Sequence, residues 1–342
     1  MTYVLVLVGL ALAFPWGAAP IARYLAGVLP PREACRVLTG AAVLLAGGTI
    51  AALIGLFHVP FLAALEQVSF ARVLEAWPAA VPFACVAGAV LLVQLVLLVR
   101  RWSQYRSVLR RAWSSVSGGR GDGDLLVVPG NGVDAFALPG YRGRRGRVVV
   151  TSAMVRSLKA REREVLLAHE RAHLAGRHHV LSAAADLAAV VHPALRSLRD
   201  ALVFHLERWA DEEAAAVVGD RRVAAAAIAR AALAGASPGR AGASHGRVGG
   251  YPLLSVTSGP VPRRVEALLS PEPRAPRGGA RRAGVTALAG TVLGAAVGAL
   301  ALAYGLHEYV EYSAQRLLGV TAPSGCSGMW DTLRALFGTG AP

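Results

Sequence analysis

Cysteine is scarce in this chain, and so are acidic residues. Only Cys35, Cys85 and Cys326 occur among 342 residues. So few thiols exclude a disulfide framework and a cysteine-rich metal site. Asp and Glu number 21 against 36 Lys and Arg, which gives a formal net charge of +15.

A strongly basic chain could serve a nucleic acid or an anionic membrane surface. The sequence contains no nucleic-acid-binding motif, and its arginines crowd next to apolar segments. Anionic lipid headgroups therefore account for the charge more simply than a direct nucleic-acid partner does.

Charged residues make up only 17% of the chain, whereas 54% of its residues are hydrophobic. The apolar residues are concentrated in four runs, each long enough to cross a bilayer as a helix. No basic residue precedes the first run, so we expect a retained span and not a cleaved signal peptide. The sequence predicts a mainly α membrane protein with four transmembrane helices. The runs are Val4–Leu25, Val37–Phe57, Ala79–Val99 and Ala283–Leu306.

The placement of arginine predicts the orientation of these spans. Basic residues cluster after the first run, after the third and before the fourth, and basic loops stay in the cytoplasm. We therefore expect a plasma-membrane protein with a three-helix region over 1–99, a cytoplasmic domain over 100–282, a fourth helix over 283–306 and a tail over 307–342. The N-terminus and the tail are predicted to lie outside. The arginines concerned are Arg23, Arg32, Arg36, Arg100, Arg101, Arg106, Arg110, Arg111, Arg274, Arg277, Arg281 and Arg282.

The segment between the third and fourth spans is predicted to be an α+β domain. Short apolar pieces between Gly, Pro and Asn turns indicate strands, and longer alanine-rich stretches indicate helices. The expected strands are Leu125–Val128, Ala135–Leu138 and Arg147–Thr151. The expected helices are Arg161–Ala175, Leu181–Val191, Ala194–Val218, Arg221–Ala234 and Pro262–Leu269.

The first of these predicted helices contains the string His-Glu-Arg-Ala-His at residues 169–173. Residues four apart share a helix face, so the imidazoles of His169 and His173 can reach one metal ion. Glu170 then projects beside that metal, where it can take a proton from water. An ordinary amphipathic helix with solvated histidines can carry the same string by chance.

A second pair of residues supports the metal interpretation. Glu207 and Asp211 lie four apart in an alanine-rich stretch and share a helix face. Glu207 would be the third ligand and leave the fourth position open, while Asp211 would accept the spare N–H of a ligating histidine. The alternative, a charged solvent-facing surface, is the expected role of Glu212 and Glu213. With the histidine string, the pair predicts one Zn²⁺ per chain.

These strings resemble the membrane-embedded gluzincin peptidases that include the β-lactam sensor-transducers. They resemble more distantly the heat-shock and prenyl-protein membrane proteases. The resemblance covers residues 100–270 and the order of three spans before and one after the domain. It implies a zincin-like zinc endopeptidase with ligands His169, His173 and Glu207, the base Glu170, and a strand Ala135–Leu138 that pairs with extended substrate. The similar stretches are Ala135–Gly140, Val148–Thr151, Glu164–His179 and Glu207–Ala214.

The chain departs from the antibiotic sensors after the fourth run. Those sensors carry a large external penicillin-binding domain at this point. Here 36 residues follow Leu306, and they contain no Ser-x-x-Lys motif. β-Lactam sensing is therefore not expected.

We expect a membrane-anchored zinc endopeptidase that cleaves a cytoplasmic or membrane protein in regulatory signalling, by resemblance a transcriptional repressor. A quality-control protease of the heat-shock type would apply the same chemistry to other substrates. A catalytically silent transducer is a further alternative, which the intact Glu170 disfavours. The donor that would stabilise an oxyanion stays open among His178, His179, His205 and Arg264.

The fourth run contains a repeated small residue, Gly290, Gly294 and Gly298, on one helix face. Such a face lets another helix approach closely, either within the chain or from a second copy.

Overall fold

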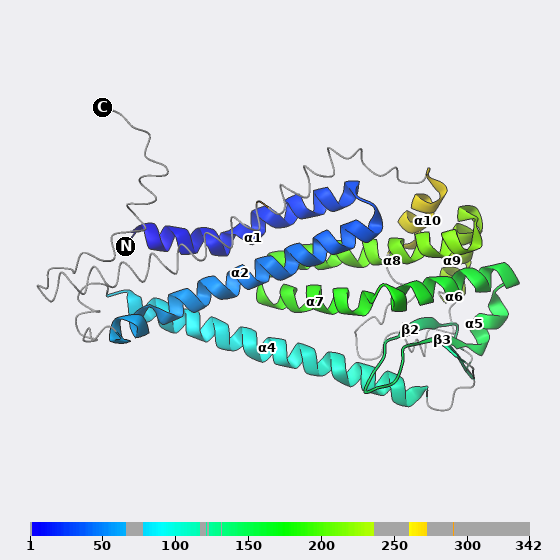
Figure 1. Cartoon of the computed structure of the whole chain (residues 1–342), viewed down its shortest axis with the longest axis horizontal. Coiled ribbons are helices and arrows are strands. Elements are labelled where there is room, and N and C mark those ends of the chain that lie inside the picture. The colour runs from blue at the N-terminus through cyan, green and yellow to red at the C-terminus, as the bar shows by residue number, and fades with distance from the viewer. Residues whose placement is uncertain are drawn as a thin grey trace, which may run out of the picture. The chain divides into compact units, whose positions relative to one another are not determined.

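The computed structural model describes residues 2–65, 78–116, 121, 123–130, 132–235, 260–271 and 290. It is mainly helical, with one three-stranded sheet (Figure 1). Described residues within 11–50 and 92–296 form one compact unit, and the other described residues, 2–10, 51–65 and 78–91, belong to a second. The helices are α1 (Thr2–Val28), α2 (Pro31–Leu65), α4 (Ala80–Ser115), α5 (Ser152–Ser157), α6 (Ala160–Ala175), α7 (His178–Val191), η1 (Pro193–Leu195), α8 (Arg196–Val218), α9 (Arg221–Gly235) and α10 (Val261–Leu269). The strands are β1 (Leu125–Val128), β2 (Ala135–Leu138) and β3 (Arg147–Thr151).

The three strands have the bounds that the sequence predicts, and most helices begin or end within a few residues of their predicted limits. The predicted helix over 194–218 is divided, because Pro193 starts the 3₁₀ turn η1 before α8 begins. The His192 side chain caps that turn by accepting from the backbone N–H of Ala194 at 3.2 Å. Gly219 ends α8 with φ 71, a conformation that glycine adopts without strain.

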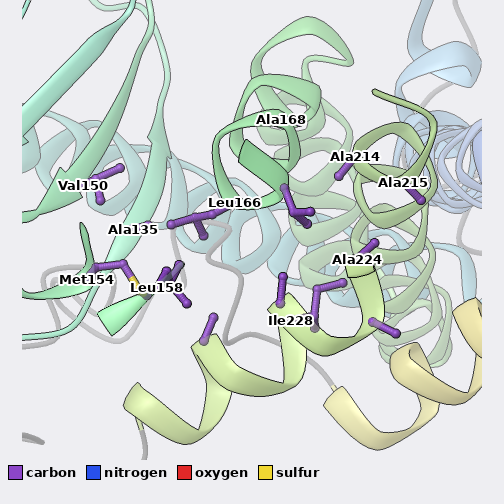
Figure 2. Close-up of a cluster of buried hydrophobic side chains, with 14 of the residues drawn as sticks. Ala135, Val150, Met154, Leu158, Leu166, Ala168, Ala214, Ala215, Ala224 and Ile228 are labelled. Atoms are coloured by element: carbon purple, nitrogen blue, oxygen red, sulfur yellow. The ribbon is translucent and has the colours of Figure 1, made fainter. Parts of the chain in front are cut away.

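The sheet has the order β1-β3-β2, with β1 parallel and β2 antiparallel to β3. Side chains alternate between its two faces, as the period of two requires. Val148 and Val150 join a core with α5, α6, α8, α9 and α10, part of which Figure 2 shows. Val149 points to the opposite face, where Trp113 at the end of α4 covers the sheet. Apolar cover on both faces explains why these short strands contain so few polar residues.

A second core joins α1 and α2 to the α7–η1–α8 segment. It is built from many alanines and a few leucines, and small side chains let helices approach closely. Leu198 and Leu202 on α8 are fully buried in it. At the turn between α7 and α8, the Gln94 amide of α4 donates to the Val191 carbonyl at 3.1 Å. The helices around the candidate site therefore pack directly on the apolar helices α1 and α2.

Two helices are long and apolar enough to cross a membrane, within the part of the chain that the structure describes: Pro31–His58 and Val81–Ser115. In Pro31–His58, half of the apolar 18-residue window is buried, as in a core helix. In Val81–Ser115, only 17% of the corresponding window is buried. Leu92 and Leu95 on α4 are 62% and 58% exposed, and such an apolar surface is typical of contact with lipid or with another helix.

The other two predicted spans have no such support. Val4–Leu25 lies in α1, which is not one of the two described helices that are long and apolar enough to cross a membrane. Ala283–Leu306 lies outside the described residues apart from Gly290, as do Gly294, Gly298 and the tail. The four-span topology therefore stays a prediction.

We predict that Ala42→Leu lowers the free energy of unfolding by about 1–3 kcal/mol, because an added side chain has no room in a packed core. Ala42 lies on α2 within the alanine-rich core and is 0% exposed. Thermal unfolding of the full chain in detergent measures the change. Val43→Leu is the matched control, since the neighbouring Val43 is 47% exposed. Equal effects of the two substitutions would contradict the packing described for this core.

Candidate metal centre

Helix α6 carries the histidine string and has well-defined ends. It begins after Lys159, whose backbone N–H donates to the Glu162 carboxylate at 2.9 Å. It ends at Gly176, whose N–H donates to the Ala172 carbonyl at 2.8 Å. A side chain at position 176 would collide with the ring of His178. Glycine at this position therefore lets His178 approach the end of the helix.

His169, His173 and Glu207 converge on one point inside the domain, and all three are buried. The Nε2 atoms of the two histidines are 3.1 Å apart. Each also lies 3.6 Å from an oxygen of Glu207, which α8 brings against α6. Donor atoms at 2.0–2.1 Å from a tetrahedral zinc ion are separated by about 3.4 Å, which is close to the separations in this set. Two histidines and one glutamate are also a donor set typical of catalytic zinc sites.

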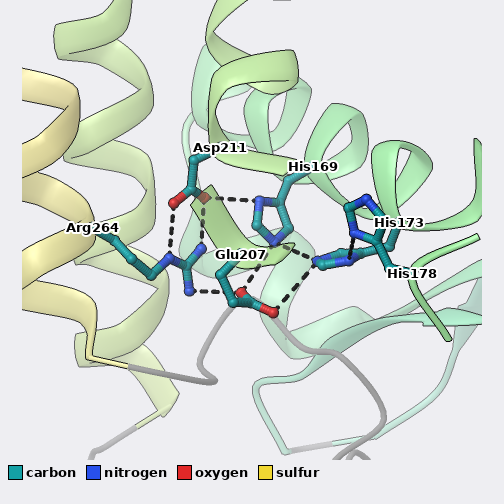
Figure 3. A network of polar contacts seen from close by, with 6 residues as sticks. All are labelled: His169, His173, His178, Glu207, Asp211 and Arg264. Carbon is teal, nitrogen blue, oxygen red and sulfur yellow. Dashed lines mark hydrogen bonds and ion pairs between the residues drawn. The ribbon is translucent and has the colours of Figure 1, made fainter. Parts of the chain in front are cut away.

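The second nitrogen of each histidine ring lies close to another polar group (Figure 3). Nδ1 of His169 lies 3.0 Å from Oδ1 of Asp211. Nδ1 of His173 lies 2.7 Å from Nδ1 of His178, which follows on α7. Such contacts orient a ring and select the tautomer that leaves Nε2 free for a metal.

Arg264 of α10 binds both carboxylates of α8. Its Nη1 lies 2.8 Å from Oε2 of Glu207. Its Nε and Nη2 donate to the two oxygens of Asp211 at 2.8 and 2.6 Å. The arginine is 0% exposed, and its single positive charge is shared between two buried carboxylates. Arg264 therefore positions Glu207 and Asp211, and its guanidinium is committed to them.

Glu170 lies beside the cluster and has no hydrogen-bond partner for either carboxylate oxygen among the described residues. Its side chain is fully buried. A buried carboxylate without a partner is costly, so one that persists in a fold calls for an explanation. A water molecule or a substrate amine at the centre of the cluster would supply the missing partner.

Burial and neighbouring charges shift the pKa values of the residues in the cluster. Burial raises the pKa of Glu170 to about 8. Burial lowers the pKa of His173 well below its ordinary value. Burial also acts to lower the pKa of His169, but the nearby carboxylates of Asp211 and Glu207 outweigh it and raise the value to about 9. Burial acts to raise the pKa of Asp211, yet Arg264 and His169 bring it down to about 2.

The four candidate oxyanion donors lie in different surroundings. His178 lies behind His173, and Arg264 is held by carboxylates. Neither His179 nor His205 makes a hydrogen bond or ion pair with the cluster within the described part of the chain. No sequence motif pointed to Asp134, a buried residue just before β2 whose negative charge contributes to the raised pKa of Glu170.

We predict that Arg264→Ala lowers the free energy of unfolding by about 3–5 kcal/mol, because it removes the arginine that pairs with two buried carboxylates. Chemical unfolding of the metal-free full chain measures this loss. Arg263→Ala is the matched control, since Arg263 is exposed and stacks 4.6 Å above the Phe204 ring. That contact contributes about 0.5–1 kcal/mol at such a site. Similar losses in both variants would show that the ion pairs of Arg264 contribute no more to the free energy of unfolding than the surface contact of Arg263 does.

Residues 100–235 match the family model described as Peptidase family M48. No curated protein and no solved structure matches the chain. The matched segment runs from the later part of α4 to the end of α9 and includes His169, His173 and Glu207, whereas Arg264 lies beyond it. Together with the buried cluster, the match supports a zinc metallopeptidase of family M48. The finer resemblance to the sensor-transducers stays a prediction.

Proposed function

We propose that this protein is a membrane-anchored, zinc-dependent endopeptidase. The observation that carries the proposal is the convergence of three buried ligand atoms next to a buried carboxylate without a hydrogen-bond partner in the described residues. A purely structural metal site would not require that carboxylate. The match to peptidase family M48 over residues 100–235 supports the same chemistry.

His169, His173 and Glu207 would hold the zinc ion. Zinc, when bound, would acidify a water molecule and polarise the scissile carbonyl. Glu170 would accept the proton from that water and deliver it to the departing amine, because its carboxylate lies at the cluster and is otherwise unengaged. Asp211 would keep His169 in the tautomer that presents Nε2 to the metal.

The remaining contacts keep these groups in position. Arg264 holds Glu207 and Asp211 through its buried ion pairs, and His178 supports the ring of His173. A tight network of this kind keeps the ligands preorganised, so little reorganisation is needed during the reaction.

We also propose that the zinc domain faces the cytoplasm, with both chain ends outside. The support is the excess of arginine in 100–282 and next to the ends of the apolar runs. The proposed substrate is a protein or peptide, and a transcriptional repressor is the specific candidate that the sequence resemblance favours. A quality-control protease would use the same residues, and the two differ only in substrate choice. Gly290, Gly294 and Gly298 stay a proposed contact with another helix.

We predict that Glu170→Gln retains zinc but loses cleavage by about 10²- to 10⁴-fold, because a general base is removed and no ligand is. Metal analysis and casein hydrolysis by the purified full chain measure the two effects. Glu207→Ala should lose most of its zinc. Glu164→Gln is the matched control, an exposed carboxylate on the same helix. Equal cleavage by the wild type and the Glu170→Gln protein would refute the assigned base, and unchanged zinc in Glu207→Ala would remove Glu207 from the ligands.

We predict that a reporter enzyme active only outside the cytoplasm works when fused after Pro342 and fails when inserted between residues 240 and 245. The physical reason is the arginine asymmetry, since basic loops resist transfer across the membrane. A reporter that fluoresces only in the cytoplasm should give the opposite pattern at the same two positions. A reversed pattern for both reporters would invert the proposed topology.

A further inference from the structure

A basic cavity of about 520 Å³ lies on the side of α6 that faces away from the ligand cluster. Its wall includes Ala168 and Ala172 of α6, whereas His169 and His173 point to the other side of the helix. Four arginines line it: Arg32 and Arg36 from the first turns of α2, Arg171 from α6 and Arg177 from the turn before α7.

The positive charge of this cavity is only partly balanced. The acidic residue in its lining is Glu213, whose carboxylate accepts a hydrogen bond from the indole N–H of Trp209 at 3.1 Å. Arg171 is paired with Asp124 at 2.6 Å. Arg36 and Arg177 form no ion pair with any carboxylate among the described residues. The cavity therefore offers two exposed guanidinium groups that lack a counter-charge.

Two features show that the cavity is shaped and is not merely a charged surface. Arg177 has φ 50, in the left-handed region that costs a residue with a side chain about 1–2 kcal/mol. A strained backbone at a cavity wall is a feature often associated with function. Arg32 stacks 5.5 Å above the Trp209 ring, and Leu181 and Val217 supply an apolar border.

We propose that this cavity binds the phosphate of an anionic phospholipid headgroup. Guanidinium groups form strong, directional hydrogen bonds with phosphate, and the apolar border suits the first methylenes of the acyl chains. The lipid source follows from location, because Arg32 and Arg36 open α2, one of the two helices apolar enough to span a membrane. In this respect the inference rests on the proposed membrane anchoring. Phosphate groups of a bilayer lie where such spans end.

The cavity is connected to the metal cluster by direct contacts. Trp209, in the cavity wall, lies with its ring centroid 4.4 Å from that of His178. His178 in turn contacts His173, a ligand of the cluster. The α6 backbone is shared by both sides. A lipid in the cavity would therefore stabilise the arrangement of α6, α7 and α8 around the zinc ligands.

The test uses the purified full chain in a neutral detergent, with three probes: dihexanoyl-phosphatidylglycerol, dihexanoyl-phosphatidylcholine and inorganic phosphate. We expect isothermal titration to detect the phosphatidylglycerol and neither of the other two at the same concentration. Arg36→Ala/Arg177→Ala should weaken this binding by about tenfold or more. Arg163→Ala is the matched control, an exposed arginine on α6 outside the cavity lining. Raising the salt concentration should weaken binding to the wild type.

Each outcome decides a part of the proposal. Equal phosphatidylglycerol binding by the double variant and the wild type would overturn the site. Inorganic phosphate that binds as tightly as the lipid, and is lost in the double variant, would overturn the lipid assignment. A lower unfolding temperature of the double variant without lipid would identify misfolding, and Arg36→Ala alone would then be used for the same comparison. Glu170→Gln should bind the lipid as the wild type does, so a failure of the peptidase proposal is separated from a failure of this one.

Discussion

The candidate site depends on the buried ion pairs that join Arg264 to Glu207 and Asp211. Removing two carboxylates from water costs several kcal/mol each unless a cation compensates them. Arg264 provides that cation from α10, and it thereby ties α10 to α8. Asp211 in turn positions His169, because the same carboxylate contacts both the arginine and the imidazole. The geometry of the ligands is thus a consequence of charge balance in an otherwise apolar interior.

Small side chains determine how closely the surrounding helices pack. Alanine is the commonest residue in the core between α1, α2 and the α7–η1–α8 segment, which lets these helices approach closely. Gly176 has the same effect locally, because any larger residue would displace His178 from its place behind His173. Close packing of this kind leaves little space for the ligands to shift, which keeps the cluster preorganised.

Helix α6 separates two different electrostatic environments. On one side, His169, Glu170 and His173 face a buried cluster in which Arg264 pairs with two carboxylates. On the other side, Arg171 faces a basic cavity open to solvent. The division follows from the helical period of 3.6, which places neighbouring residues of one short string on different faces. One helix thus presents the candidate metal ligands on one face and a basic residue on another.

The local sequence determined the strands and the spacing within each helix. Apolar pieces between Gly and Pro turns specified β1, β2 and β3, and the four-residue spacing placed His169 and His173 on one face of α6. Only the tertiary structure decided that Glu207 comes within 3.6 Å of both histidines and that Arg264 reaches Asp211 across 53 positions in the chain. The physical reason is that periodicity reports which way a side chain points from its own helix. Contacts between distant segments depend instead on how the helices pack. That packing depends both on pairing the buried charges and on burying small apolar side chains.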